Sequence, residues 1–493
     1  MAGWLALAIV LAPAVAIALI LLTRRAAWAE TLNLAASVIA FLAALALAAS
    51  VGAAPQVYWR SYVILDGLGA WSILCAAIVY LLASIYAIGY MRLLGEANRL
   101  PRFYALFAGF ALTTLVGPMM NSAGVYWIAI ELTTLVSTFL VAFEHAPESI
   151  EAAWKYIIVV SGGISLALLG TVLFYWAGSF VLGPGYDMTW AVLRYAAPHA
   201  NHALLVLAFL LVLIGYGTKV GLAPMHTWLP DAHSEGPAPV SALLSGALLN
   251  TAMIGIVRYL AVVDAAGVGP LPRTVLVVLG TASLLVAALF IVRQRGVKRL
   301  MAYSSVEHMG VIALGFGFGG PLGVAGALYH MLNHSLNKSL MFFGAGSAMR
   351  SYGTRNIGGI RLVARRFPVF GALWLAGAVA ITGAPPFGLF ASELTILRAG
   401  LRTSSAWAVF VMAALLIVIF IGFLNHFRIM YFEPAGADQV PQHTVSAWCL
   451  VPMWGALLPL LVFGLWWPDA LWSYFVTVAH SLGGAVQIAG AAP

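Results

Sequence analysis

Charge is scarce in this chain. Asp, Glu, Lys and Arg together make up 8% of its 493 residues, whereas hydrophobic residues make up 63%. A soluble domain of this size needs far more charge on its surface. Apolar runs of about 20 residues recur from one end of the chain to the other, so the scarcity is not confined to one anchor segment. The composition excludes a soluble enzyme with a membrane anchor and indicates an all-α, polytopic membrane protein.

Cysteine is also nearly absent, which limits the cofactors that the chain can hold. Its 2 cysteines, Cys75 and Cys449, lie in separate apolar segments. Iron–sulfur clusters are commonly held by sets of Cys thiolates, and a c-type haem needs a CxxCH motif. We therefore expect no metal and no cofactor in this chain. If it works in a redox complex, the redox cofactors lie in partner subunits.

The basic residues indicate membrane topology. The net charge is +8, but Lys and Arg are dispersed over short loops between apolar segments, which does not favour a nucleic-acid partner. They are most frequent in alternate loops, as at Arg24 and Arg25 and in 293–299 and 350–366. Loops rich in Lys and Arg face the cytoplasm. The distribution predicts a bacterial or archaeal cell-membrane protein with both termini on the outer side.

Fourteen apolar segments are long enough to cross a bilayer as helices, which takes about 20 residues each. The first is followed directly by Arg24 and Arg25 without a small-residue cleavage site, so we expect a transmembrane helix rather than a signal peptide. The predicted spans lie near residues 3–22, 30–50, 66–90, 103–120, 124–143, 154–177, 204–228, 238–261, 274–292, 301–319, 323–348, 369–397, 404–431 and 446–467.

Two of the predicted spans contain helix breaks. The seventh carries Gly221 and Pro224, and the twelfth carries Pro385 and Pro386 in succession, which removes consecutive backbone donors. Broken helices at corresponding positions of two halves indicate an inverted-repeat transporter. We therefore expect N-terminal helices in 1–102, one five-helix repeat in 103–261, a second in 274–431, and a C-terminal helix and tail in 446–493.

An isolated charge lies beside each break. Lys219 precedes the first break, and Glu393 follows the second. Glu131 is the one charge in the fifth span. A charged side chain at the bilayer centre costs roughly 2.5–3.5 kcal/mol on insertion scales, so such residues are functional candidates. We interpret Glu131 as a proton-accepting partner of Lys219; the alternative is that it only neutralises this lysine.

The eleventh span has the strongest polar periodicity. His330, His334 and Lys338 are spaced by four residues, so they share one face of a helix. Asn333 and Asn337 lie on the adjacent stripe. A polar stripe on an otherwise apolar helix should face a hydrated interior. Interhelical hydrogen bonding without transport would explain the asparagines well but the lysine poorly.

Glu307 and His308 enter the tenth span within AYSSVEHMGVIALG. A histidine takes and releases protons near neutral pH, so His308 suits a proton relay. Glu307 lies nearer the predicted membrane surface, where it is either part of an ion access path or merely solvated. Lys298 is either an ordinary cytoplasmic-side lysine or the inner end of a proton path, and the sequence leaves both open.

Four potential ligands follow the seventh span: His226, Asp231, His233 and Glu235. Their spacing matches no closed structural-zinc pattern, and no thiol accompanies them. We favour a proton uptake path or a docking turn at the inner surface over a metal site. At the start of the third span, Asp66 predicts a helix cap or a surface contact.

Motifs across the fifth to twelfth spans resemble the antiporter-like subunits shared by respiratory complex I, multi-subunit sodium/proton antiporters and membrane-bound group 4 hydrogenases. They are IELTTL, GTKVGLAPMHTWLPDAHSEGPAPVSALLSG, VKRLMAYSSVEHMG, YHMLNHSLNKSLMFF and ITGAPPFGLFASELTILR. Within this family, SVEHMG and the last motif are most similar to component F of hydrogenase-4 and formate hydrogenlyase-type complexes. The resemblance implies fourteen core helices in two inverted repeats and a mid-membrane chain of ionisable groups.

The resemblance also implies residue roles. Glu131 and Lys219 would form the first-half pair, and Glu393 would be the terminal site. The residues of the central axis would be His308, His334 and Lys338.

The eighth span departs from the family pattern. Some members carry a second lysine or a histidine there, whereas this chain has Ser245 and Asn250. These side chains hold water but do not change charge, so the link between Lys219 and the central axis depends on hydration.

These features favour a proton- or sodium-translocating subunit of a larger redox complex, embedded in lipid and without a catalytic centre of its own. Iron–sulfur clusters and Ni–Fe or other redox centres are expected in its membrane and peripheral partner subunits. Two alternatives are an assembly subunit with an incomplete channel and a membrane partner of an inorganic-carbon uptake protein. A one-chain antiporter is the least favoured.

Overall fold

The computed structural model describes residues 1–52, 54–93, 97–434, 441 and 443–483. Helices occupy all fourteen predicted spans. The α-helices are α1 (Ala2–Thr23), α2 (Ala26–Ser50), α3 (Gly67–Arg92), α4 (Leu100–Val116), α5 (Ala123–Val141), α6 (Pro147–Leu182), α7 (Trp190–Ala196), α8 (His202–Val220), α9 (Trp228–Glu235), α10 (Ala238–Leu243), α11 (Leu249–Ala265), α12 (Pro270–Val292), α13 (Val297–Phe318), α14 (Gly320–Tyr352), α15 (Val363–Arg366), α16 (Pro368–Ile381), α17 (Gly388–Gly400), α18 (Ala406–Phe432), α19 (Ala447–Leu465) and α20 (Asp469–Gly483).

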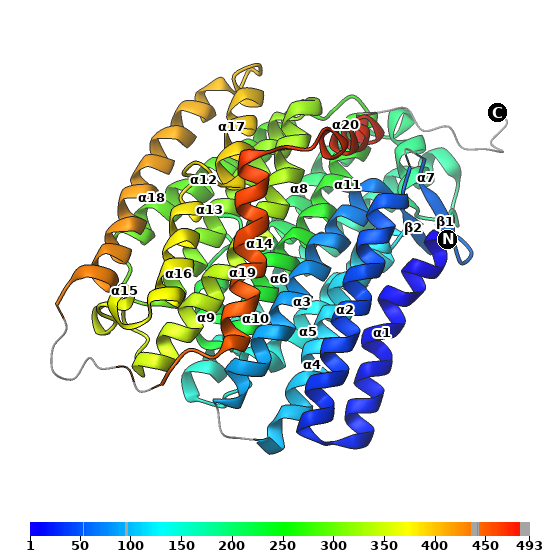
Figure 1. Cartoon of the computed structure of the whole chain (residues 1–493). Coiled ribbons are helices and arrows are strands. Elements are labelled where there is room, and N and C mark those ends of the chain that lie inside the picture. The colour runs from blue at the N-terminus through cyan, green and yellow to red at the C-terminus, as the bar shows by residue number, and fades with distance from the viewer. Residues whose placement is uncertain (53, 94–96, 435–440, 442, 484–493) are drawn as a thin grey trace.

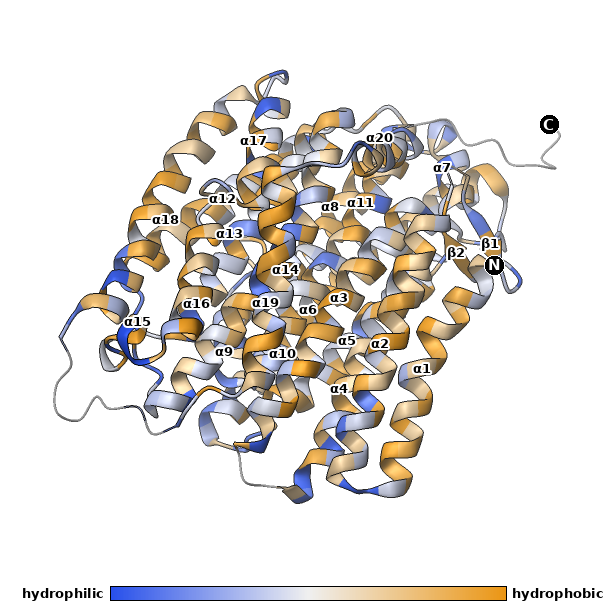
Figure 2. Ribbon diagram, viewed as in Figure 1, coloured by the Kyte–Doolittle hydropathy of each residue, from blue (hydrophilic) through white to orange (hydrophobic). Residues whose placement is uncertain are grey.

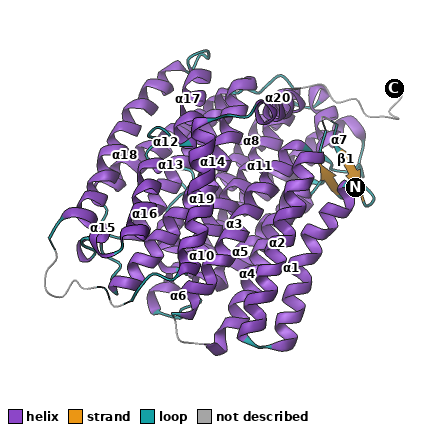
Figure 3. Cartoon of the chain, viewed as in Figure 1, coloured by secondary structure: helices purple, strands orange, loops and turns teal. Residues whose placement is uncertain are grey.

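The remaining elements are short (Figure 3). Strands β1 (Gln56–Tyr58) and β2 (Val63–Leu65) form an antiparallel hairpin. The 3₁₀ helices are η1 (Ala97–Arg99), η2 (Gly117–Met119), η3 (Ala197–His199) and η5 (Ile357–Gly359), and a π-helical segment, η4 (Leu244–Leu248), joins α10 to α11.

Within the described residues, 11 helices are long and apolar enough to cross a membrane. The chain is therefore a multi-pass membrane protein. Helices α13 and α14 fall outside that set because polar side chains lower their hydropathy, and α16 and α17 are short because their span is broken. Apolar side chains are exposed on peripheral helices such as α1, α6 and α18, where lipid would cover them (Figure 2).

Helix α14 lies at the centre of the bundle (Figure 1). It packs against α3, α13, α17 and α19, and nearly all of its 33 residues are buried. This position follows from its sequence, because the polar stripe of α14 would be costly against lipid and is placed against protein instead.

The first predicted break separates α8 from α9. Gly221 ends α8 with a positive φ of 81°, which a residue with a side chain adopts only at a cost. Pro224 lies in the loop that follows. The indole nitrogen of Trp228, at the start of α9, donates to the carbonyl of Thr218 at 2.7 Å and so satisfies one of the acceptors that the break leaves free.

The second predicted break separates α16 from α17. Gly383 has a φ of 65°, and Pro385 and Pro386 follow it before α17 begins at Gly388. Both broken helices are thus confirmed. The division into inverted repeats over 103–261 and 274–431 stays a prediction.

Asp66, at the start of α3, and helix α20 both make contacts between helices that are distant in sequence. Asp66 caps α3, as predicted, by accepting from the Gly69 amide at 2.8 Å, and it also pairs with Arg258 of α11 at 2.8 Å. Helix α20, which the sequence analysis did not predict, turns away from the direction of α19 (Figure 1). Its Tyr474 hydroxyl donates to the Gly67 carbonyl at 2.6 Å. The rest of the predicted tail, 484–493, lies outside the described residues.

Candidate functional site: a buried row of ionisable side chains

Lys219 is fully buried at the end of α8, just before the first break. Its ammonium donates to the Thr134 hydroxyl on α5 and to the Tyr156 hydroxyl on α6, both at 2.8 Å. The Tyr156 ring also lies 5.0 Å from the ammonium, within the range of a cation–π contact. The Tyr156 hydroxyl is within 2.8 Å of the Ser137 hydroxyl. The lysine thus binds neutral hydroxyl groups.

Glu131 lies on the same helix as Thr134, one turn before it. One carboxylate oxygen accepts a hydrogen bond from Ser161 at 2.7 Å. The other is buried and has no hydrogen-bond partner in the described part of the chain. Glu131 and Lys219 therefore belong to one local site but form no ion pair among the described residues, and the ammonium bonds the Thr134 hydroxyl, one helical turn from Glu131.

A second site of the same composition lies in the other half. Lys338, on α14, is fully buried and donates to the Ser304 hydroxyl at 2.5 Å and to the Met301 carbonyl at 3.3 Å, both on α13. Glu307 lies one turn after Ser304 on that helix. In each half, a buried lysine therefore bonds a hydroxyl one helical turn from a buried or half-buried carboxylate.

The burial of Glu307 differs from our expectation. We placed it near the membrane surface as a possible access residue, but it is 1% exposed, and both carboxylate oxygens are without a hydrogen-bond partner among the described residues. The physical reason is that α13 begins at Val297, so Glu307 lies about 15 Å along the helix axis, near the middle of a bilayer.

A histidine cluster lies between α13, α14 and α17. His308 Nδ1 is 3.0 Å from His330 Nε2, and His330 Nδ1 is 2.9 Å from the Ser392 hydroxyl. The rings of His308 and His334 are 5.5 Å apart. The predicted polar face of α14 is thus real and points at α13, because His330, His334 and Lys338 all meet side chains or backbone of that helix.

Glu393 extends this cluster to the second break. Its carboxylate lies against Gly383, so close that a Cβ built on that glycine would be 2.0 Å from Oε2. One ligand-type atom each from His308, His330 and Glu393 lies within 4.8 Å of the others. These residue types can bind a metal. They can also share protons, which agrees with the short His308 to His330 distance.

The π-helical segment η4, which lies within the eighth span, contacts this cluster. A π-helical turn frees backbone carbonyls, and it often occurs at functional sites. Here the Ser245 carbonyl lies 3.2 Å from His334 Nε2, and the Gly246 carbonyl accepts from the Ser335 hydroxyl at 2.6 Å. The Ser245 hydroxyl is 2.7 Å from that of Ser305.

The side-chain amides of three buried asparagines also lie in the interior of the bundle. Asn250 donates to the Gly246 carbonyl and to the Ser335 hydroxyl, at 3.2 and 2.9 Å. Asn333 donates to the Tyr329 carbonyl, and Asn337 donates to the carbonyl of Gly377, both at 3.0 Å. All three amide oxygens are buried and without a partner within the described ranges.

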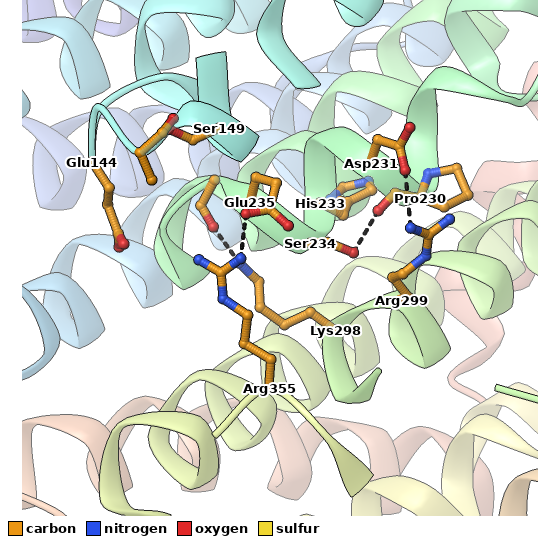
Figure 4. A network of polar contacts seen from close by, with 12 residues as sticks. Glu144, Ser149, Pro230, Asp231, His233, Ser234, Glu235, Lys298, Arg299 and Arg355 are labelled. Carbon is orange, nitrogen blue, oxygen red and sulfur yellow. Dashed lines mark hydrogen bonds and ion pairs between the residues drawn. The ribbon is translucent and has the colours of Figure 1, made fainter. Parts of the chain in front are cut away.

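Charged residues at the end of α9 form a surface network (Figure 4). Asp231 pairs with Arg299 at 3.1 Å, and Glu235 pairs with Arg355 at 2.5 Å. Lys298 is 4% exposed and donates to the Gly236 carbonyl.

His226 and His233, the two histidines of the segment that contains α9, are more buried than its acids. His233 is fully buried, stacks on Phe342, and has both ring nitrogens without a partner in the part of the chain that the structure describes. His226 is 8% exposed beside Tyr303. The four residues of this segment thus do not converge on one point: the two acids pair with basic residues, and the two histidines pack separately.

Residues 121–421 match the family model described as NADH:quinone oxidoreductase/Mrp antiporter, TM. The chain belongs to this family. Two curated members are similar over most of their length. The Hydrogenase-4 component F homolog of Methylacidiphilum infernorum is 38% identical over 72% of this chain and 74% of its own. The NADH-quinone oxidoreductase subunit N of Desulforudis audaxviator is 31% identical over 83% of this chain and 81% of its own.

The fold is also shared with a solved antiporter complex. A chain in the structure of the Mrp complex from Dietzia sp. DQ12-45-1b has a TM-score of 0.86 and 21% identity, and the likeness covers 98% of this chain and 97% of that one. The family match begins ahead of α5 and ends within α18. It therefore contains every buried ionisable residue from Glu131 to Glu393.

Sequence reasoning missed the hydroxyl groups of the site. Thr134, Tyr156 and Ser304 hold the two lysines, and Ser392 holds His330. Serine and threonine are common in membrane helices, so their presence alone gave no signal. For Thr134 and Ser304, a usable signal was the one-turn spacing from Glu131 and Glu307 on the same helices.

Proposed function

We propose that this chain translocates protons, or sodium ions, as the antiporter-like subunit of a membrane-bound redox complex related to hydrogenase-4 and complex I. The observation that carries the proposal is the pair of lysine, hydroxyl and carboxylate sites, one in each half, with a buried histidine cluster on α13 and α14. Relatives named as a Hydrogenase-4 component F homolog and an NADH-quinone oxidoreductase subunit support the choice of complex. Iron–sulfur and Ni–Fe centres would belong to partner subunits.

Each lysine would act as an electrostatic switch. In one state Lys219 bonds hydroxyls, as in this structure, and in the other it approaches Glu131 directly. A unit charge pair at about 4 Å interacts by about 4 kcal/mol at an effective dielectric constant near 20. Moving one charge against 100 mV costs about 2.3 kcal/mol. One switch of this size is therefore large enough to drive one ion against a membrane potential.

Access from the α9 end would pass Lys298 and His233. A cavity of about 300 Å³ is lined there by Glu144, Glu235, Lys298 and Arg350, among others. His233 is buried with two unpartnered ring nitrogens within the described residues, which suits a proton carrier. Glu235 and Asp231 would hold the mouth of the path, and His226 would line its side.

The membrane and its sidedness follow from the same proposal. The basic loops at the α9 end would face the cytoplasm of a bacterium or archaeon, with both termini outside. The units 103–261 and 274–431 would be inverted repeats, each with its broken helix fourth in order, after N-terminal helices in 1–102.

An assembly subunit with an interrupted path is the second candidate, and one observation favours it. No hydrogen bond among the described residues joins the Lys219 site to the histidine cluster. Asn250, which replaces a titratable residue, is itself held by Gly246 and Ser335.

The test is to purify the complex from its native membranes and identify its subunits by mass spectrometry. Ion movement per electron is then followed in proteoliposomes with pH-sensitive and Na⁺-sensitive dyes. Glu131→Gln should lower ion movement per electron, whereas Glu151→Gln, an exposed carboxylate paired with Lys155, should not. Redox turnover without ion movement in the native complex would favour the assembly subunit instead.

A further inference from the structure

A large groove lies on the side of the bundle, away from the buried row. Its volume is about 1180 Å³, and α12, α13 and α18 contribute its walls. Leu285, Leu289 and Val418 line it and are exposed by 48, 63 and 43%. Pockets for drug-sized ligands measure about 300–1,000 Å³, so this groove has room for acyl chains.

One end of the groove is cationic. Arg293, Arg295, Arg299 and Arg355 line it, together with the amide side chains of Gln294 and Asn356. Arg299 and Arg355 already pair with acids of α9. Arg293 and Arg295 are exposed and have no ion-pair partner within the described residues. The groove thus combines an apolar wall with two available guanidinium groups at one end.

This combination distinguishes the groove from other basic loops of the chain. Arg24 and Arg25 are also exposed at a helix end, but they line none of the described cavities. A general rule of topology accounts for arginines in a loop. It does not account for their position in the lining of a large, mainly apolar groove.

We propose that the groove binds one anionic phospholipid, with its phosphate at Arg293 and Arg295 and its acyl chains against α12 and α18. Guanidinium groups bind phosphate oxygens by charge-assisted, often bidentate hydrogen bonds. The amides of Gln294 and Asn356 supply further donors. The groove shares Glu235, Lys298 and Arg355 with the access cavity proposed above, whereas Arg293 and Arg295 line the groove and not that cavity.

The full chain, with the subunits that purify with it, is titrated in detergent with phosphatidylglycerol or phosphatidylcholine, and bound lipid is counted by native mass spectrometry. Phosphatidylglycerol should bind more tightly. The double variant Arg293→Gln/Arg295→Gln should weaken its binding about 30-fold, at about fivefold per basic residue. The matched double variant Arg24→Gln/Arg25→Gln should change it by less than about twofold.

A third variant tests the apolar wall without changing charge. Leu289→Trp fills the groove at an exposed position, so it should weaken lipid binding while leaving the thermal unfolding temperature unchanged. Equal binding of the two lipids, or equal losses in the two arginine double variants, would overturn the proposal. So would displacement of the lipid by millimolar inorganic phosphate, which would identify the site as one for free phosphate.

Discussion

Gly383 offers the sharpest test of the second break, because Ala at this position would collide with Glu393. The glycine has a φ of 65°, and a Cβ added to it would lie 2.0 Å from Glu393 Oε2. Cβ atoms are essentially never found closer than 3.0 Å to another atom, so the carboxylate must retreat by about 1 Å.

Gly267→Ala is the matched control. Gly267 has a φ of 76°, and a Cβ there would meet nothing within 4 Å. Both substitutions cost roughly 1–2 kcal/mol of stability for the left-handed backbone. Only Gly383→Ala also moves Glu393. A misplacement of about 1 Å in a reacting group can lower a rate on the order of 100-fold, so ion transport should fall strongly in this variant alone.

The assay is ion movement per electron in native membrane vesicles, normalised to the amount of folded complex. Gly383→Ala should resemble Glu393→Gln, and Gly267→Ala should resemble the native protein. Equal transport by the two alanine variants would show that the position of Glu393 does not matter, and the assignment of this residue to the ion path would fail.

Three further substitutions test other parts of the structure. Lys338→Met removes the buried ammonium of the second half and should abolish ion movement, whereas Arg402→Met, at an exposed position, should not. Equal effects of the two substitutions would contradict the proposed switch. Arg258→Met leaves the partly exposed Asp66 without its cation and should destabilise the protein by roughly 1–3 kcal/mol, seen as a lower unfolding temperature in detergent. Asn250→Leu removes one amide with hydrogen bonds to α14 and should cost roughly 1–3 kcal/mol. Its transport should fall less than that of Lys338→Met, because Asn250 carries no charge; native transport would exclude it from the path.

The membrane helices were predictable because length and apolarity decide them. The fourteenth span was expected near 446–467 and is Ala447–Leu465. Helix α6 runs beyond its predicted span, 154–177, because its first turns are polar and helical outside any apolar run. Helix α20 was missed since it is only 15 residues long and amphipathic, a pattern that hydropathy averages away.

The site was predictable in composition but not in its contacts. A four-residue spacing placed His330, His334 and Lys338 on one face, because helical geometry alone fixes this. Which helix they face depends on the packing of segments far apart in sequence, so the His308 contact could not be derived. Glu307 lies deeper than expected because α13 begins at Val297, ahead of the predicted start of the span at 301.

The arrangement of Lys219 and Glu131 shows the same limit. Both residues were singled out as isolated charges, and a direct pair was the simplest arrangement. In the structure the ammonium instead donates hydrogen bonds to the hydroxyl groups of Thr134 and Tyr156, which lie on two neighbouring helices. A hydrogen-bonded but uncompensated ammonium is costly inside a membrane, which agrees with a residue kept for ion movement.

The central claim is that Lys219 carries ions in step with redox turnover. Its most direct test is the number of protons, or sodium ions, moved per electron by reconstituted native and Lys219→Ala complexes. The account predicts that this number falls in the variant while electron transfer continues. An unchanged number of ions per electron would contradict it.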